Sequence, residues 1–245
     1  MNPVVRTVLL RLLRAPRSWL AIGFWIAVAV APAVVEHLHA VGHGADHALL
    51  GFYASIALPF LAYSVLSAVL GRDGLGRAGL PLVNFGAPPG EVALWTVAVA
   101  VAVSAILGGG LGAAVDAIGH GPLDPRLIED AVRALGAGAI GGAAYAAMFA
   151  MGASLGARGF GRSIFLVLDW VFGNGVDASA LFTPRAHVRS LLGGAAPLEV
   201  TGRVSYAALA LMIVIFTLLA CSRASKTKWS PAPDRGVVGG SSTRR

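Results

Sequence analysis

The sequence is poor in charged residues. Only 13% of its 245 residues are Asp, Glu, Lys or Arg, about half the usual share for a soluble domain. Hydrophobic residues make up 56% of the chain, and the mean hydropathy is +0.75. A soluble fold of this size cannot bury so much apolar surface, because most residues of a small domain face water. The shortage of charge therefore excludes an ordinary soluble protein and indicates an integral membrane protein.

Cysteine and acidic residues are also scarce. The single cysteine, Cys221, excludes an internal disulfide framework. It lies at the end of an apolar run, where we expect a buried structural thiol. The chain has 12 acidic against 19 basic residues, and its net charge is +7. A basic protein can bind nucleic acid, but the positions of these charges favour a membrane topology and no nucleic acid partner.

Apolar runs long enough to cross a bilayer recur along the chain. A hydrocarbon core about 30 Å thick needs roughly 20 apolar residues in a helix. Six runs approach that length: 18–35, 48–70, 92–115, 134–155, 163–182 and 204–222. The fifth run is interrupted by Asp169, Asn174 and Asp177, so we expect a shorter or broken helix there. The predicted fold class is an all-α integral membrane protein with six transmembrane helices.

The positions of Lys and Arg set the expected orientation, because cytoplasmic loops carry an excess of these residues. With the N-terminus in the cytoplasm, 14 of the 19 basic residues lie on the cytoplasmic side. The other five lie outside: Arg126, Arg133, Arg185, Arg189 and Arg203. Both termini are therefore expected in the cytoplasm. The predicted location is the cell (inner, cytoplasmic) membrane, which the chain crosses several times.

Three segments make up the predicted chain. Residues 1–17 form an amphipathic interfacial helix, because apolar residues recur at helical spacing from Val4 to Leu13 and arginines occupy the rest of the wheel. Residues 18–222 form the six-helix transmembrane domain. Residues 223–245 form a disordered, basic cytoplasmic tail that is rich in Ser, Pro and Gly.

The segments between the runs have features of their own. The loop 71–91 is too long for a simple turn and carries apolar residues, so we expect a short helix there that contacts another surface. The outer loop 116–133 holds an amphipathic patch, and we expect a short interfacial helix in the outer loop 183–203. Glycines spaced at i, i+4 predict close helix packing inside lipid. These pairs are Gly108 and Gly112, Gly138 and Gly142, and Gly152 and Gly156.

The stretch EHLHAVGHGADH, residues 36–47, concentrates histidine at the outer end of the first run. His39, His43 and His47 are spaced at i, i+4 and i+8. On a helix this spacing would align three imidazoles on one face, an arrangement that suits Zn²⁺, Cu²⁺ or Ni²⁺. Two intervening glycines weaken a helix by about 1 kcal/mol each relative to Ala. They favour a loop that lines an aqueous rim, and metal binding is the alternative.

Asp169 is an acidic residue inside the expected span 163–182. A charge in lipid is costly and normally faces a partner or a cavity. Asp169 lies about two helical turns from the inner end of its run. We therefore expect either an ion pair with Arg162 or Arg158, or a side chain that reaches the cytoplasmic interface.

Two stretches imitate enzyme motifs. GASLG matches the G-x-S-x-G pattern around Ser154, with His187 or His120 as a candidate partner. That pattern acts on a strand-to-helix turn, and no strand precedes this one. GARGFGRS imitates a P-loop with Arg162 in place of the lysine, again without a preceding strand. We therefore expect no catalytic residue and no nucleotide site in this chain.

A basic amphipathic helix, six spans and a long loop after the second span form a recognisable pattern. The loop reads RDGLG, then LPL, then GAPPGE. Over residues 1–222 this pattern resembles the permease subunit of ABC-2 type ABC transporters. The loop residues that match the family outline are Arg72, Asp73, Gly74, Leu80, Leu82, Pro88 and Glu91. The basic residue that the family has shortly after the Glu is absent, and Trp95 and Thr96 stand in that region.

The resemblance implies a subunit of an ATP-driven transporter, usually an exporter. Two copies of the chain, or this chain and a homologue, would form the transport path in membrane lipid. Separate ABC ATPase subunits would bind and hydrolyse ATP, so the chain would need no cofactor of its own. The loop 71–91 would couple it to the ATPase, and the helix 3–17 would also touch that subunit. Lipid, peptide, drug, polysaccharide and copper-related cargo all stay open. The alternative is a membrane metal-handling protein that uses the His-rich loop 36–47.

Overall fold

The computed structural model describes residues 2–39, 47–120, 125–156 and 158–226. Every regular element within these ranges is helical, which confirms the all-α prediction. The elements are α1 (Pro3–Leu13), α2 (Pro16–His39), η1 (His47–Ala57), α4 (Leu58–Leu70), α5 (Leu75–Asn84), α6 (Pro89–His120), α7 (Leu127–Ala153), α8 (Gly161–Phe172), η2 (Ala178–Phe182), α9 (Pro184–Leu191), η3 (Pro197–Glu199) and α10 (Gly202–Lys226).

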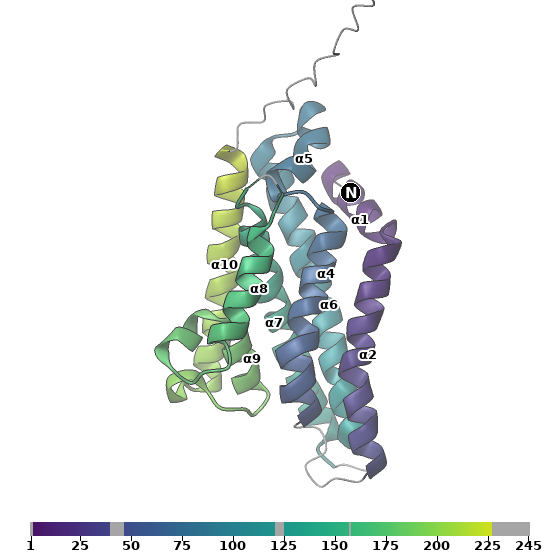
Figure 1. Ribbon diagram of the computed structural model, residues 1–245, viewed down its shortest axis with the longest axis vertical. Helices are drawn as coiled ribbons and strands as arrows, with labels where there is room; N and C mark the ends of the chain where they lie inside the picture. The colour runs from purple at the N-terminus through teal and green to yellow at the C-terminus, as the bar shows by residue number, and fades with distance from the viewer. Residues whose placement is uncertain (1, 40–46, 121–124, 157, 227–245) are drawn as a thin grey trace, which may run out of the picture.

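Five helical stretches in the described part of the chain are long and apolar enough to cross a membrane, as a multi-pass membrane protein requires. They are α2, the stretch His47–Asn84 that contains η1, α4 and α5, and the helices α6, α7 and α10. These long helices run side by side in one elongated bundle (Figure 1). The helices α1 and α5 and the last turn of α10 lie together at one end of it, which we call the α5 end. The two ends of the described chain therefore lie on the same side of the bundle.

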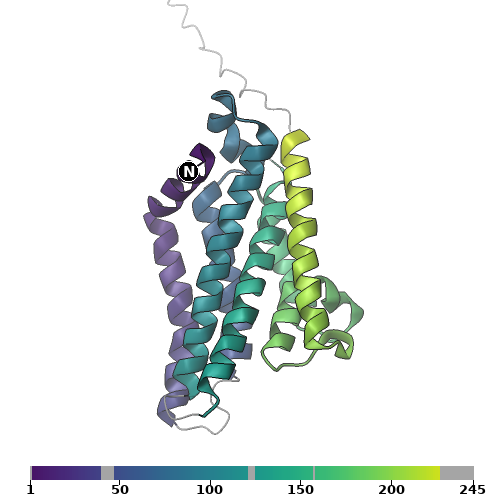
Figure 2. The ribbon, with the colours of Figure 1, turned by 180° about the vertical axis from the view of Figure 1, so that it is seen from behind.

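The first helix is amphipathic and ends at Leu13, three residues before Pro16. Val4, Val8 and Leu12 recur every four residues and are buried against α4 and α6. The Asn2 side chain caps the helix, because its Oδ1 accepts a hydrogen bond from the Val4 backbone N–H at 2.8 Å. The next helix starts at Pro16 and runs off at an angle, as the view from behind shows (Figure 2). The predicted helix over 3–17 is confirmed over Pro3–Leu13.

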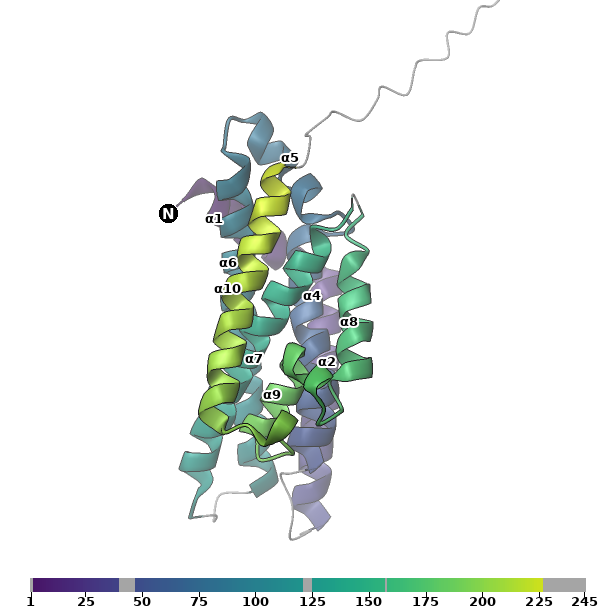
Figure 3. The same ribbon diagram turned by 90° about the vertical axis from the view of Figure 1, so that its left-hand side faces the viewer.

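The core of the bundle is α7, which contacts α4, α6, α8, α9 and α10 (Figure 3). Glycine and alanine make up most of its buried face, so neighbouring backbones come close. A Cβ on Gly138 would clash with the carbonyl oxygen of Gly108, and a Cβ on Gly108 would lie 2.7 Å from that of Gly138. Tyr53 lies at the same contact, and its hydroxyl donates to the Gly108 carbonyl at 2.7 Å. The predicted packing role of these glycines is confirmed.

Not every predicted glycine pair packs in this way. Gly152 lies against the backbone of Gly161, which brings the end of α7 against the start of α8. A Cβ added at Gly156 would have no atom of another residue within 4 Å, and the φ of this glycine is +88°. Gly156 permits the turn after α7 and makes no helix contact, so the packing prediction for it is wrong.

The fifth expected span is much shorter than predicted. In place of a helix over 163–182, α8 has 12 residues, about 18 Å in length, whereas a hydrocarbon core is about 30 Å thick. Gly173 ends the helix, and η2 and α9 then pack beside the lower half of α10 (Figure 1). The predicted short helix within 183–203 is confirmed as α9. The interruptions in the sequence around Asn174 mark the real end of the helix.

The other turns are also shorter than the sequence indicates. The loop expected over 116–133 is mostly helix, because α6 runs to His120 and α7 starts at Leu127. Glu129 and Asp130 lie in the first turn of α7, where acidic side chains stabilise a helix N-terminus. The first span likewise continues to His39. At the other end of the chain, α10 ends at Lys226, and residues 227–245 of the predicted tail lie outside the described residues.

The outer faces of α2 and α10 carry exposed apolar side chains along their length. Leu20, Phe24 and Leu38 on α2 and Leu211 and Leu218 on α10 are each more than half exposed. In water such faces would be unfavourable, whereas lipid accepts them. They therefore agree with a chain that is surrounded by a bilayer.

Candidate functional site

The α5 end carries a short amphipathic helix. Leu75, Ala78 and Gly79 of α5 are buried against the bundle, where the helix packs on α6 and α10. Phe85, which follows the last residue of α5, is 92% exposed. Phe85 is therefore a large apolar side chain that the bundle leaves uncovered. The short helix predicted within 71–91 is thus confirmed, and its contact with a partner stays a prediction.

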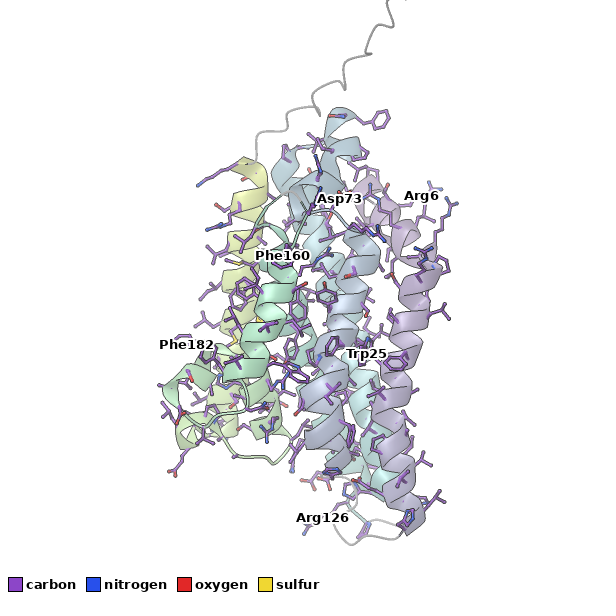
Figure 4. All side chains as sticks on the ribbon, in the orientation of Figure 1. Arg6, Trp25, Asp73, Arg126, Phe160 and Phe182 are labelled. Carbon is purple, nitrogen blue, oxygen red and sulfur yellow. The ribbon has the colours of Figure 1, made fainter. Side chains whose placement is uncertain are left out.

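The residues predicted to couple this loop to a partner are spread over one end of the molecule. Arg72 and Asp73 are exposed in the turn between α4 and α5, and Gly74 is the buried N-cap of α5. Leu80 and Leu82 are half-buried within α5. Figure 4 shows Asp73 at the α5 end, together with Arg6, and Arg126 at the opposite end.

The last two members of the predicted set lie at the start of α6. Pro88 is exposed just before the helix, and Glu91 lies in its first turn. The Glu91 Oε1 accepts a hydrogen bond from the Asn2 side chain at 3.1 Å. This bond joins the start of α1 to the loop, so both predicted partner-facing segments belong to one surface.

A buried arginine fastens the turn between α4 and α5 to α8. Arg162, at the cytoplasmic-side start of α8 on the predicted orientation, is 6% exposed. Its Nη2 donates to the Gly71 carbonyl at 3.1 Å, and its Nε donates to the Gly159 carbonyl at 3.3 Å. Its Nη1 lies 3.5 Å from the Ser67 hydroxyl oxygen. The guanidinium also lies 5.8 Å from the centre of the Tyr63 ring.

The backbone strengthens the same junction. Gly159 has a φ of +61°, and a Cβ there would lie 2.9 Å from the Asp73 carbonyl oxygen. Only glycine tolerates both the backbone conformation and the approach. Gly159, between α7 and α8, therefore packs directly on the turn that precedes α5.

The other charged residue of α8 forms a buried ion pair with α9. Asp169 is 1% exposed, and its Oδ2 lies 3.1 Å from the Arg185 Nε. The Arg185 backbone N–H donates to the other carboxylate oxygen at 3.3 Å, and the Tyr145 hydroxyl donates to Oδ2 at 3.0 Å. The predicted pairing with Arg162 or Arg158 is wrong, and so is the predicted reach to the interface. The chain turns back after α8, and this places Arg185 against the carboxylate.

The Arg185 guanidinium group makes further contacts beyond its ion pair with Asp169. Its Nη1 lies 3.4 Å from the Asn174 side-chain oxygen, and its guanidinium carbon lies 5.2 Å from the centre of the Trp170 ring. Its Nη2 is buried with no hydrogen-bond partner in the described residues. The sequence places Arg185 in an outer loop and does not reveal this role. One feature of the sequence could have indicated it: a Gly-Asn-Gly stretch follows Asp169. A turn there reverses the chain and brings the next arginine, Arg185, close to the carboxylate.

An apolar cavity opens beside this ion pair. It has a volume of about 750 Å³ and lies between α8, α10, α7 and the η2 segment. Apolar side chains form most of its wall, among them Phe165, Phe172, Met212 and Phe216. Asp169 lies at its edge. A cavity of this size can hold an apolar or amphiphilic molecule with one polar group.

The predicted histidine site lies mostly outside the described residues. His43 falls in that part, so the set of His39, His43 and His47 is not seen as a whole. The His39 Nδ1 lies 2.8 Å from the Val35 carbonyl oxygen, at the end of α2. His47 starts η1 and packs edge-on against Phe52. Within the described ranges no three potential ligands gather around one point, and metal binding stays a prediction.

The serine motif is held by local bonds. The Ser154 hydroxyl donates to the Met151 carbonyl at 2.6 Å, at the end of α7. The two ring nitrogens of His187 lie 3.2 Å from the Ser205 hydroxyl oxygen and 3.0 Å from the Leu181 carbonyl oxygen. Among the residues that the structure describes, no hydrogen bond joins Ser154 to a histidine. The geometry offers no base to this serine.

Comparison of the chain with known protein families, with curated protein sequences and with solved structures finds no match.

Proposed function

We propose that the chain is the membrane-spanning permease subunit of an ATP-driven transporter of the ABC-2 type, an exporter in the cell membrane. Two copies form the transport path, and separate ATPase subunits dock at the α5 end. The observation that carries this proposal is the junction between α8 and the turn that precedes α5. The buried Arg162 of α8 donates to the Gly71 carbonyl in that turn. The surface helix α5 begins after the turn, at Leu75, and the exposed Phe85 follows its last residue.

The mechanism follows from the contacts of α8. Arg162 and Asp169 lie seven residues apart on this helix, about 10 Å along its axis. Arg162 holds the turn before α5, and Asp169 holds Arg185 at the start of α9. When ATP binding closes the ATPase subunits, their movement shifts α5. Because packed helices move as rigid bodies, the shift passes through α8 to α9 near the exit.

The second permease copy is placed at the face formed by α8 and α10. The apolar cavity opens between these helices. This chain encloses the cavity only in part. On the outer face of α8, Ile164, Val167 and Val171 are exposed. Two copies that face each other here would enclose a path lined by apolar side chains, with the Asp169–Arg185 pair at its edge. The cargo class that fits such a path is an amphiphile.

The proposal is tested with Phe85, because this side chain is exposed and supports no contact inside the bundle. The full chain with a C-terminal affinity tag is isolated from its native membranes in mild detergent, and ATP hydrolysis by the eluate is measured. We expect ATPase activity to co-purify with the unchanged chain. Phe85→Asp is expected to lower it at least tenfold, because a charge replaces the aromatic anchor at the docking surface.

The matched control is Ile128→Asp, which changes an exposed apolar residue at the opposite end of the bundle. It is expected to keep the co-purified activity. An eluate of the unchanged chain without ATP hydrolysis contradicts the proposal. Equal activity from the Phe85→Asp chain removes α5 as the docking surface.

A further inference from the structure

A second cavity lies at the α5 end, between α1, the last turns of α4 and α5. Its volume is about 630 Å³. Arg11 and Arg14 reach it from α1, and Arg77 reaches it from α5. Asp73 is the one acidic residue in its wall, so three guanidinium groups face one carboxylate. The cavity thus has an excess of positive charge that comes from two separate helices.

The structure leaves most of this charge without a counterion. The Arg11 Nη1 donates to the Ala78 carbonyl at 2.7 Å, which uses one of five guanidinium donors. Arg14 and Arg77 are exposed. In the part of the chain that the structure describes, no ion pair joins either of them to a carboxylate. Three like charges around one cavity repel one another, and an anion between them removes that repulsion.

The rest of the wall is apolar and lies at the depth of a membrane interface. Leu10, Val69 and Leu70 contribute apolar surface to the cavity. Trp19 lies in the first turn of α2, and its indole N–H donates to the Leu12 carbonyl at 3.1 Å. Tryptophan is enriched at the level of lipid headgroups, and α1 lies across the end of the spans as an interfacial helix does. The anion that fits here therefore carries an apolar part.

We propose that this cavity binds the phosphate group of an anionic phospholipid from the leaflet at the α5 end. Arginine pairs well with phosphate, because its planar donors match two phosphate oxygens at once. The lipid phosphate contacts Arg14 of α1 and Arg77 of α5, and its acyl chains leave along the apolar wall. One bound lipid thus holds the interfacial helix to α5. This inference does not depend on the proposed transport function.

The test measures lipid retention by the full chain. The protein in nonionic detergent micelles is titrated with phosphatidylglycerol or with phosphatidylcholine, and bound lipid is counted by native mass spectrometry. We expect one phosphatidylglycerol to be retained at a concentration at least tenfold below that for phosphatidylcholine. Arg14→Gln together with Arg77→Gln leaves the Arg11 hydrogen bond in place and is expected to weaken phosphatidylglycerol binding roughly 10- to 30-fold.

The control removes the same charge from the same end of the molecule. Arg6→Gln together with Arg17→Gln changes two exposed residues that do not line the cavity, and it is expected to keep the preference for phosphatidylglycerol. An equal loss in both double variants overturns the proposal, because binding then follows net charge alone. Equal retention of the two lipids by the unchanged chain also overturns it.

Two further arms separate a lipid site from a site for free phosphate and from a loss of folding. Inorganic phosphate at millimolar concentration is added to the titration. If it displaces phosphatidylglycerol completely, the cavity is a site for free phosphate and the lipid proposal fails. The helical circular dichroism and the thermal unfolding midpoint of both double variants are compared with those of the unchanged chain. A variant that unfolds is replaced by the single change Arg14→Gln, which is expected to weaken phosphatidylglycerol binding about fivefold.

Discussion

Two of the helices that pack against α7, α6 and α8, are held by different kinds of contact. The pair α6 and α7 is packed through glycine, and its backbones touch at Gly108, Gly138 and Gly142. The helix α8 also meets α7 through glycine, where Gly161 lies against the Gly152 backbone. However, polar side chains near its two ends, Arg162 and Asp169, add directed bonds to α7 and to other elements. Glycine packing depends on shape over many residues, whereas the bonds of α8 depend on a few directed contacts. The polar contacts of α8 are therefore the ones that a single substitution can remove.

The largest effect is expected from the ion pair of α8. Asp169→Leu leaves the buried Arg185 guanidinium without its counterion and is expected to lower the free energy of unfolding by about 3–5 kcal/mol. The measurement is unfolding of the detergent-solubilised chain by increasing dodecyl sulfate. The double change Asp169→Leu and Arg185→Met removes both charges and is expected to recover most of that loss. A double variant as unstable as the single one would show that the pair is not the source of the stability.

A smaller effect is expected where glycine backbones touch. Gly142→Ala places a Cβ against the Ser104 carbonyl group, and the overpacking is expected to cost about 1–3 kcal/mol of unfolding free energy. The control on the facing helix is Gly110→Ala, since no atom lies within 4 Å of a Cβ at Gly110. It is expected to be neutral or to stabilise by up to about 1 kcal/mol, because Ala favours a helix. Equal thermal stabilities of the two variants would contradict the packing argument.

The smallest change in stability is expected at the junction of α8 with α5. Arg162→Lys keeps the charge but loses the planar fork that reaches Gly71, Gly159 and Ser67 at once. The expected loss is about 1 kcal/mol of unfolding free energy. Hydrogen exchange should rise in the turn before α5 and stay unchanged in α6 and α7. Faster exchange throughout the bundle would mean that Arg162 supports the whole fold and not this junction.

The long helices were predictable because hydrocarbon imposes a simple rule on sequence. A run of about 20 apolar residues must become a helix, since no water is present to satisfy the backbone. The run 204–222 shows this, because α10 extends only a few residues beyond it at each end. The spacing of Val4, Val8 and Leu12 likewise predicts the buried face of α1.

The polar contacts were not predictable in the same way. The sequence shows that Asp169 needs a partner, but the nearest arginines along the helix were the wrong ones. Its partner, Arg185, comes close only because α8 ends at Gly173 and the chain folds back. The contacts of Arg162 with the turn before α5 depend on how α7 leads into α8, which no local pattern specifies. The cavity between α1 and α5 is likewise formed by three elements, so no single segment indicates it.

The shortness of α8 has a consequence for how the protein is made. This helix carries an aspartate among only 12 residues. An aspartate at the centre of a membrane helix costs about 2.5–3.5 kcal/mol on insertion, and so short a segment offers little apolar length to offset it. In the structure the Asp169 carboxylate is paired with Arg185, which lies 16 residues further along the chain. We therefore expect α8 to enter the bilayer together with the segment that carries Arg185 and not as an independent span.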